Sequence, residues 1–177
     1  SNKTLKGEVS YTLKEIGSKK KIYAYKKEIK GEKGIQHHRE TLNIRQAVKH
    51  WDDLHPNLYR LEICITRKGQ SQLKTVDFGF RNVTASRSKI LINNRPVFMR
   101  GNLDCLHFPL TGYPSCDIQE WERIFRIYKS YGLNHVRFHS WCPPEAAFTA
   151  ADRIGIYIQA EVLWIDWWMS VVRKERP

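Results

Sequence analysis

The sequence has no apolar run that approaches the roughly 20 residues of a membrane-spanning helix, and its first residues lack the apolar core of a signal peptide. Its four cysteines form no Cys-x-x-Cys pair, and no Cys/His spacing matches a zinc site. These absences argue against a membrane protein and against a structural metal. They leave the cellular compartment open.

Acidic residues are few beside basic ones, 18 against 30, which gives a net charge of +12. The excess lies in residues 1–86, with 18 Lys and Arg against 9 Asp and Glu, and much of it falls in the turns at 17–21 and 30–34. Solvated lysines that discourage pairing at strand edges are the favoured interpretation. The alternative is a basic binding module for nucleic acid or acidic polysaccharide, which requires lysines and aromatic side chains on one shared face.

Hydrophobic residues make up 41% of the chain, enough for a sizeable core. Residues 1–86 show short alternating segments separated by Gly-, Lys- and Ser-rich turns. Five strands are expected there, at 4–13, 20–29, 35–44, 58–67 and 73–80, and no helix. The pattern favours an antiparallel β-sandwich of immunoglobulin size, with Trp51 as a core residue in the connection before the fourth strand.

From residue 87 the pattern changes to hairpin, helix, strand, helix and strand. An Asn-Asn-Arg-Pro turn divides a hairpin that ends at Arg100, and the helices are expected to end at Gly132 and Gly155. Strands follow both helices, at 134–138 and 156–161. This order predicts parallel βαβ units, whose functional side chains gather after the carboxyl ends of the strands. Arg100, the run His139–Trp141 and Glu161 are therefore expected at one edge of the sheet.

Several runs, in this order, resemble glycoside hydrolase family 2, the family of β-galactosidases, β-glucuronidases and β-mannosidases. "WDDLHPNLY" is similar to its Trp-x-x-x-x-Pro-x-Leu-Tyr stretch, and "FGFR" to the exit from its immunoglobulin-like domain. "ILINNRPVFMRG" and "GLNHVRFHSWCPPEAAFTAADRIGIYIQAE" resemble the first part of its barrel. The resemblance implies an immunoglobulin-like sandwich over 1–86, followed over 87–177 by the N-terminal part of a (β/α)8 TIM-barrel catalytic domain.

The resemblance also implies retaining hydrolysis of β-glycosides by two carboxylates, which in the family follow barrel strands four and seven. A full barrel needs about 250 residues. The chain is therefore expected to be a fragment without the catalytic pair and inactive alone, cut from a β-galactosidase-like parent. The expected partner is a carbohydrate, with no cofactor, no metal, no nucleic acid and no membrane; the resemblance and the lack of redox motifs favour a periplasmic or secreted protein.

Eight candidate substrate-binding residues follow from the strand ends and the resemblance. They are Arg100, Asp104, His107, Arg137, His139, Trp141, Glu161 and Trp164. The alternation along its strand predicts that Arg137 points into the barrel. Where the family has Ser-His-Tyr-Pro, this chain has His139-Ser140-Trp141-Cys142-Pro143, which displaces the histidine by one residue.

Other interpretations of these residues remain open. Glu161 suits sugar contact, structural pairing or acid/base chemistry, and His139 suits sugar contact or a hydrogen bond that orders its loop. Trp141 suits sugar stacking or packing. Trp164 belongs to an aromatic cluster expected at the rim of the site. An unpaired edge on a three-stranded parallel sheet predicts self-association of the chain. A free-standing carbohydrate-binding sandwich would leave the βαβ half unexplained.

Overall fold

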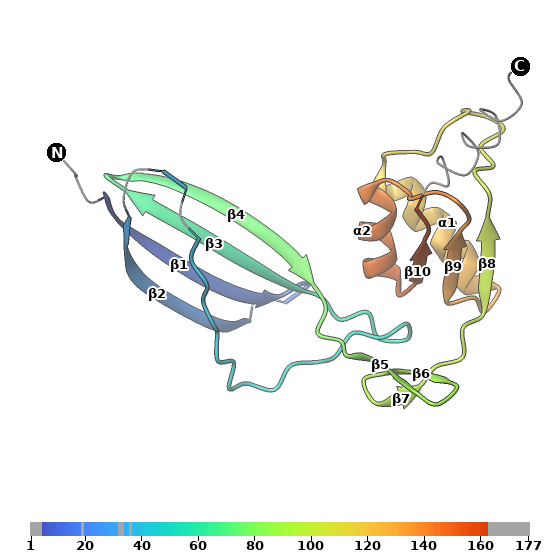
Figure 1. Ribbon diagram of the computed structural model, residues 1–177, viewed down its shortest axis with the longest axis horizontal. Helices are drawn as coiled ribbons and strands as arrows, with labels where there is room; N and C mark the ends of the chain where they lie inside the picture. The colour runs from blue at the N-terminus through green and yellow to red at the C-terminus, as the bar shows by residue number, and fades with distance from the viewer. Residues whose placement is uncertain (1–4, 19, 32–33, 36, 163–177) are drawn as a thin grey trace, which may run out of the picture. The chain divides into compact units, whose positions relative to one another are not determined.

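The computed structural model describes residues 5–18, 20–31, 34–35 and 37–162 (Figure 1). It divides into two compact units. Unit 1 comprises Ser1–Trp51 and Asn57–Phe80, and unit 2 comprises Asp52–Pro56 and Arg81–Pro177. The short segment Asp52–Pro56 therefore lies within the sequence of unit 1 but packs with unit 2.

Unit 1 is a four-stranded antiparallel sheet with the strand order β2-β1-β3-β4. Its strands are β1 (Leu5–Glu15), β2 (Lys21–Gly31), β3 (Tyr59–Arg67) and β4 (Gln70–Phe78). The pairing register places Leu13 and Tyr59 on one face, where both are buried. Trp51 is fully buried too, which confirms it as a core residue. Four of the five expected strands are thus present.

The expected strand at 35–44 is wrong, because the described residues of that range form no strand. Ile44 and Val48 instead pack as irregular chain against the cluster of Leu13, Ile22 and Tyr59. Polar residues such as His37 and His38 are exposed, so only occasional apolar side chains hold this segment to the sheet. Tertiary packing, rather than strand pairing, determines its path.

Unit 2 begins with a small antiparallel sheet of β5 (Val83–Ser86), β6 (Lys89–Ile92) and β7 (Arg95–Pro96). The expected hairpin turn is confirmed: Asn93 and Asn94 both have positive φ, 51° and 64°, as a two-residue type I′ turn requires. The sequence pattern did not predict β5. The second strand of this hairpin was expected to run to Arg100, whereas β7 is only two residues long.

A parallel sheet of three strands follows, in the order β10-β9-β8. Its elements are β8 (Gly101–Asp104), α1 (Ile118–Ser130), β9 (His135–Phe138), α2 (Glu145–Ile154) and β10 (Tyr157–Ala160). Both crossovers advance the sheet in the same direction, so the two helices cover the same face. Val136 and Phe138 are buried in the core that the helices form with this face, and Arg137 lies on the opposite face.

The helix ends follow the sequence signals. Asp117 caps α1 by accepting a hydrogen bond from the backbone N–H of Gln119, and Gly132 follows the helix with φ of 75°. Glu120, at the position of a capping-box glutamate, instead accepts hydrogen bonds from Arg123. Because β8 and β10 are the edge strands of the described sheet, the expected self-association stays a prediction. None of the described helices is long and apolar enough to cross a membrane.

Candidate functional site

The carboxyl ends of the three parallel strands bring four of the predicted residues to one edge. Asp104 ends β8, His139 follows β9 and Glu161 follows β10, while Arg137 lies within β9. The backbone N–H of His139 donates to the carbonyl oxygen of Asp104 over 2.9 Å. This contact ties the ends of β8 and β9 together; the βαβ pattern predicted His139 and Glu161 at this edge, but not Asp104.

Glu161 is held by both carboxylate oxygens. Oε1 accepts from Nε of Arg137 over 2.5 Å, and Oε2 accepts from the backbone N–H of Ser140 over 2.8 Å. These hydrogen bonds, first that from Ser140 and then that from Arg137, lower the pKa of the Glu161 carboxyl. Glu161 is therefore a paired, ionised carboxylate near neutral pH, which favours the structural-pairing interpretation over acid/base chemistry.

The loop after β9 is shaped by a backbone conformation that few side-chain-bearing residues adopt. Ser140 has φ of 62°, in the left-handed region. This conformation directs the backbone N–H of Ser140 at Glu161. The exposed His139 ring is 3.4 Å from the Ser140 hydroxyl, measured from Nδ1 to Oγ. The loop thus exposes His139 to solvent, while the hydrogen bond from Ser140 to Glu161 fixes the loop backbone.

Trp141 is a core residue in this structure, with 3% of its surface exposed. Its ring meets Phe108 and Phe138 edge-on, and its indole N–H donates to the carbonyl oxygen of Asp104 over 3.2 Å. An indole enclosed on both sides and satisfied at its polar end has no face for a sugar ring. Of the two interpretations given above, the structure therefore favours packing.

The expected position of Arg100 at a strand's carboxyl end is wrong. Arg100 immediately precedes β8, at the amino end of the sheet, and its Nε donates to the carbonyl oxygen of Gly132 over 2.6 Å. The error arose because the apolar run before Arg100 was taken as the first parallel strand. Of the remaining candidates, His107 is exposed in the loop after β8, and Trp164 lies outside the described residues.

At the amino ends of the same strands lies a polar cluster that the sequence analysis missed. Asp53, from the segment Asp52–Pro56, accepts from Tyr157 through Oδ1 over 3.1 Å and from the side-chain amide of Asn134 through Oδ2 over 3.0 Å. Its carbonyl oxygen also accepts from the Lys129 ammonium. Burial, then the charge of Asp53, raises the pKa of Tyr157. The cluster anchors this segment beneath the parallel sheet.

Gly155 lies against this cluster, and its lack of a side chain leaves space for the Asp53 backbone. It has φ of 84°, and a Cβ atom built on it would lie 2.5 Å from the carbonyl oxygen of Asp53. Only glycine allows the Asp53 backbone to approach so closely. The pair of adjacent aspartates in "WDDLHP" and the glycine that ends a helix were visible in the sequence, but nothing in it joined two positions so far apart.

Within the described residues, no group of three or more His, Cys, Asp or Glu side chains is arranged to hold a metal ion. The carboxyl-end edge therefore offers hydrogen-bonding groups and charge. Its described chemistry comprises the guanidinium of Arg137, the imidazole of His139 and the carboxylates of Asp104 and Glu161. Such groups suit recognition of hydroxyl-rich molecules.

Residues 1–81 match the family model of "Glycosyl hydrolases family 2". A β-galactosidase from Vibrio vulnificus (strain YJ016) is 27% identical over 121 residues, which are 67% of this chain and 12% of that protein. A β-galactosidase from Pectobacterium atrosepticum is 28% identical over 141 residues, 78% of this chain and 14% of that protein. The chain thus spans only a small part of the length of these relatives.

Solved structures show the same fold relationship. A glycosyl hydrolase family 2 member from Bacteroides cellulosilyticus DSM 14838 superposes with a TM-score of 0.75 at 20% identity, covering 98% of this chain and 24% of that chain. A β-glucuronidase from Parabacteroides merdae superposes with a TM-score of 0.68 at 18% identity, covering 90% of this chain and 20% of that chain. Together with the matched family model and the β-galactosidase relatives, these similarities support the interpretation of the chain as a fragment of a glycoside hydrolase family 2 protein.

Proposed function

We propose that this chain forms part of a retaining β-glycoside hydrolase and supplies one sector of its substrate-binding edge. The observation that carries the proposal is the meeting of Asp104, Arg137, His139 and Glu161 at the carboxyl ends of three parallel strands. This is the edge at which TIM-barrel enzymes bind their substrates. The names of the relatives, β-galactosidase and β-glucuronidase, support a β-glycoside as the substrate.

The same proposal assigns the two parts of the chain to domains. Residues 1–86 correspond to an immunoglobulin-like sandwich, and residues 87–177 to the N-terminal part of a (β/α)8 barrel. The parallel order of β8, β9 and β10, with a helix in each crossover, supports the second assignment. The four-stranded antiparallel sheet with its buried apolar face could supply one of the two sheets of such a sandwich, and the described residues of unit 1 form no second sheet.

In this proposal Glu161 is a positioning residue. Its two oxygens are occupied by Arg137 and Ser140, and its lowered pKa is the opposite of what a general acid needs near neutral pH. Glu161 instead orients the Arg137 guanidinium, whose terminal N–H groups can donate to sugar hydroxyls. It also holds the loop that presents His139.

The chemistry of the whole enzyme would follow the retaining course. One carboxylate attacks the anomeric carbon while a carboxylic acid protonates the leaving oxygen, and water then hydrolyses the glycosyl ester with the second group acting as base. We assign neither of these two carboxylates to this chain. The role of its own edge is to bind and orient the sugar through neutral and charged hydrogen bonds, with no cofactor.

Hydrolysis of aryl β-galactoside, β-glucuronide, β-mannoside and β-glucoside tests the proposal, with the 177-residue chain and its full-length parent assayed in parallel. Activity of the parent alone is the expected result, and it would identify the sugar. Activity of the isolated chain would mean that its own carboxylates suffice and would overturn the assignment of Glu161. A parent inactive on all four substrates would contradict the proposed reaction.

Variants of the parent separate the roles at this edge. We expect Arg137→Ala to raise KM or lower kcat/KM about tenfold to a hundredfold, because it removes charge-assisted hydrogen bonds. Arg126→Ala is a matched control, since Arg126 is an exposed arginine of α1 that also pairs with a glutamate, Glu122. Equal losses for both variants would indicate a general effect on folding rather than a contribution to substrate binding.

A further inference from the structure

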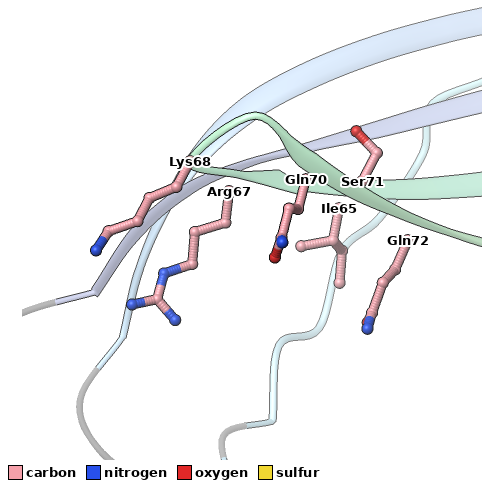
Figure 2. Close-up of a pocket in the computed structure, with 6 residues that line it drawn as sticks. All are labelled: Ile65, Arg67, Lys68, Gln70, Ser71 and Gln72. Carbon is pink, nitrogen blue, oxygen red and sulfur yellow. The ribbon is translucent and has the colours of Figure 1, made fainter.

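Unit 1 contains a hollow that has no part in the proposed hydrolysis. Its residues lie well before the parallel strands in the sequence. It has a volume of about 780 Å³ and lies at the turn between β3 and β4 (Figure 2). Its lining residues are Ile65, Arg67, Lys68, Gln70, Ser71 and Gln72. No aromatic and no acidic side chain is among them.

The hairpin holds these side chains in a fixed arrangement. Arg67 pairs with Gln70 in the register, and Ile65 pairs with Gln72, so all four share one face of the sheet, as Figure 2 shows. Lys68 and Gly69 form the turn with φ of 47° and 77°, as a tight type I′ connection requires. On the opposite face, the hydroxyls of Thr66 and Ser71 lie 2.9 Å apart, which secures the register.

The strands β1 and β3 approach closely beside Arg67. The neighbouring position on β1 is Gly7, and a Cβ atom built there would lie 3.1 Å from the carbonyl oxygen of Thr66 and 3.8 Å from the Cβ of Arg67. A larger residue at position 7 would therefore press against the backbone of Thr66. Arg67 is exposed to solvent.

In the described part of the chain, the two cationic side chains of the hollow have no carboxylate partner. Elsewhere on the sheet, Lys14, Lys26 and Arg60 each form an ion pair with a carboxylate. Among the described residues, neither Arg67 nor Lys68 forms one. Lys6 and Lys30, which face each other in the register near the same end, lie on the opposite face of the sheet, together with Glu8 and Glu28. The two cations of the hollow therefore favour an anionic ligand.

We propose that this hollow binds an anionic oligosaccharide, with Arg67 and Lys68 contacting its acidic groups. The planar Arg67 fork matches a carboxylate in a bidentate way. Gln70 and Gln72 supply amide donors and acceptors for hydroxyls, and Ile65, 45% exposed, offers a hydrocarbon surface to the ring carbons. Nucleic acid is disfavoured, because single strands bind mainly by stacking on aromatic side chains and the lining has none.

Titration of the 177-residue chain, followed by 1H–15N chemical shifts, tests the proposal. Tetragalacturonate is the uronate probe, a chondroitin sulfate tetrasaccharide the sulfated probe and cellotetraose the neutral one. We expect the two acidic probes to saturate in the millimolar range, the uronate more tightly, and to shift the amides of residues 65–72. Affinity should fall with added salt. The proposal is independent of glycoside hydrolysis, so failure of one leaves the other standing.

Charge-removing variants locate the site. Arg67→Ala should weaken binding of tetragalacturonate about tenfold, the loss of one charge-assisted contact. Arg67→Lys keeps the charge but not the fork, and should abolish the preference for uronate over sulfate. Lys21→Ala is the matched control, because Lys21 is an exposed lysine at the opposite end of the same sheet, where it pairs in the register with Lys14. It should change affinity less than about twofold.

Four results would overturn the proposal. They are equal effects of Arg67→Ala and Lys21→Ala, equal binding of cellotetraose, no saturation by either acidic probe up to about 10 mM, or tighter binding of an oligonucleotide with four phosphates than of tetragalacturonate. The first would indicate diffuse charge attraction, and the last a nucleic-acid surface. Circular dichroism of each variant checks that the sheet is intact.

Discussion

The hydroxyl of Tyr157 donates to Oδ1 of Asp53 over 3.1 Å, and the backbone N–H of Asp53 points back at the same hydroxyl over 3.3 Å. These two residues lie 104 positions apart in the sequence. The reciprocal contact fixes the segment Asp52–Pro56 to the amino ends of the parallel strands. Unit 2 is therefore assembled from two separated stretches of sequence, and its stability depends on this junction.

The Asp53–Tyr157 contact should be measurable as a coupling energy. We expect Asp53→Ala and Tyr157→Phe each to lower the free energy of unfolding of unit 2 by about 1–3 kcal/mol, because each leaves a partly buried polar group without its charged or hydroxyl partner. Urea unfolding followed by near-ultraviolet circular dichroism of the buried tryptophans gives the values. The double variant should lose less than the sum of the two singles. A coupling energy of zero would show that the contact contributes nothing.

Gly155 and Gly17 form a natural pair for testing the close approach to Asp53. Their φ values are 84° and 82°, but a Cβ atom at Gly17 has no neighbour within 4 Å, whereas one at Gly155 meets the Asp53 carbonyl at 2.5 Å. We expect Gly17→Ala to cost about 1–2 kcal/mol, the strain of the left-handed backbone alone. Gly155→Ala should cost at least about 1 kcal/mol more, through overpacking. Equal losses in thermal or urea unfolding would mean that the segment can move away freely.

Glu161 should make the loop after β9 sensitive to acid. Its folded-state pKa is lowered by Ser140 and Arg137, so its contribution to stability is fully present above its unfolded value, about 4.3. That contribution is lost as the pH falls through the folded-state pKa. We expect the Ser140 amide and the Arg137 Nε signals to shift together below about pH 4, as followed by 1H–15N spectra. The shift should be absent in Glu161→Gln.

Glu28→Gln serves as the control for that experiment, because Glu28 is an exposed carboxylate on β2 of unit 1. It should leave the acid transition of the Ser140 amide unchanged. If Glu161→Gln retained the same transition, another carboxylate would have to be its source. Asp104, whose Oδ1 accepts from the Leu106 backbone N–H over 2.9 Å, would be the next group to replace.

Sequence patterns located the elements with a strong period and missed those defined by packing. Apolar spacing and glycine stops correctly predicted α1, α2, β9 and β10, because each element carries its own signal. The segment at 35–44 alternates weakly and forms no described strand. The first parallel strand was placed before Arg100, because the apolar run "VFMRG" carries a stronger strand signal than "GNLD", which forms β8 through pairing with β9.

The candidate site was predictable to the same degree. Strand ends indicated His139 and Glu161, since the carboxyl edge of a parallel sheet is defined by order along the chain, whereas Asp104 was indicated by the family resemblance. The pairing of Glu161 with Ser140 was not predictable, because it depends on a left-handed φ at a serine, and serine gives no such signal. The burial of Trp141 likewise depends on Phe108, which approaches from a loop 33 positions earlier.

The role of Trp141 can be decided by comparison with another buried tryptophan. Trp141 and Trp121 are 3% and 2% exposed in the same core, but only Trp141 follows the carboxyl end of a parallel strand. If Trp141 packs, Trp141→Ala and Trp121→Ala should both cost about 3–5 kcal/mol in unfolding free energy. A sugar-stacking platform would instead lose affinity for a neutral β-glycoside with little change in stability. Urea unfolding of the chain and the KM of the full-length parent, measured for both variants, separate the two roles. We expect large and similar losses of stability for the two variants. A raised KM for Trp141→Ala at unchanged stability would contradict the packing assignment.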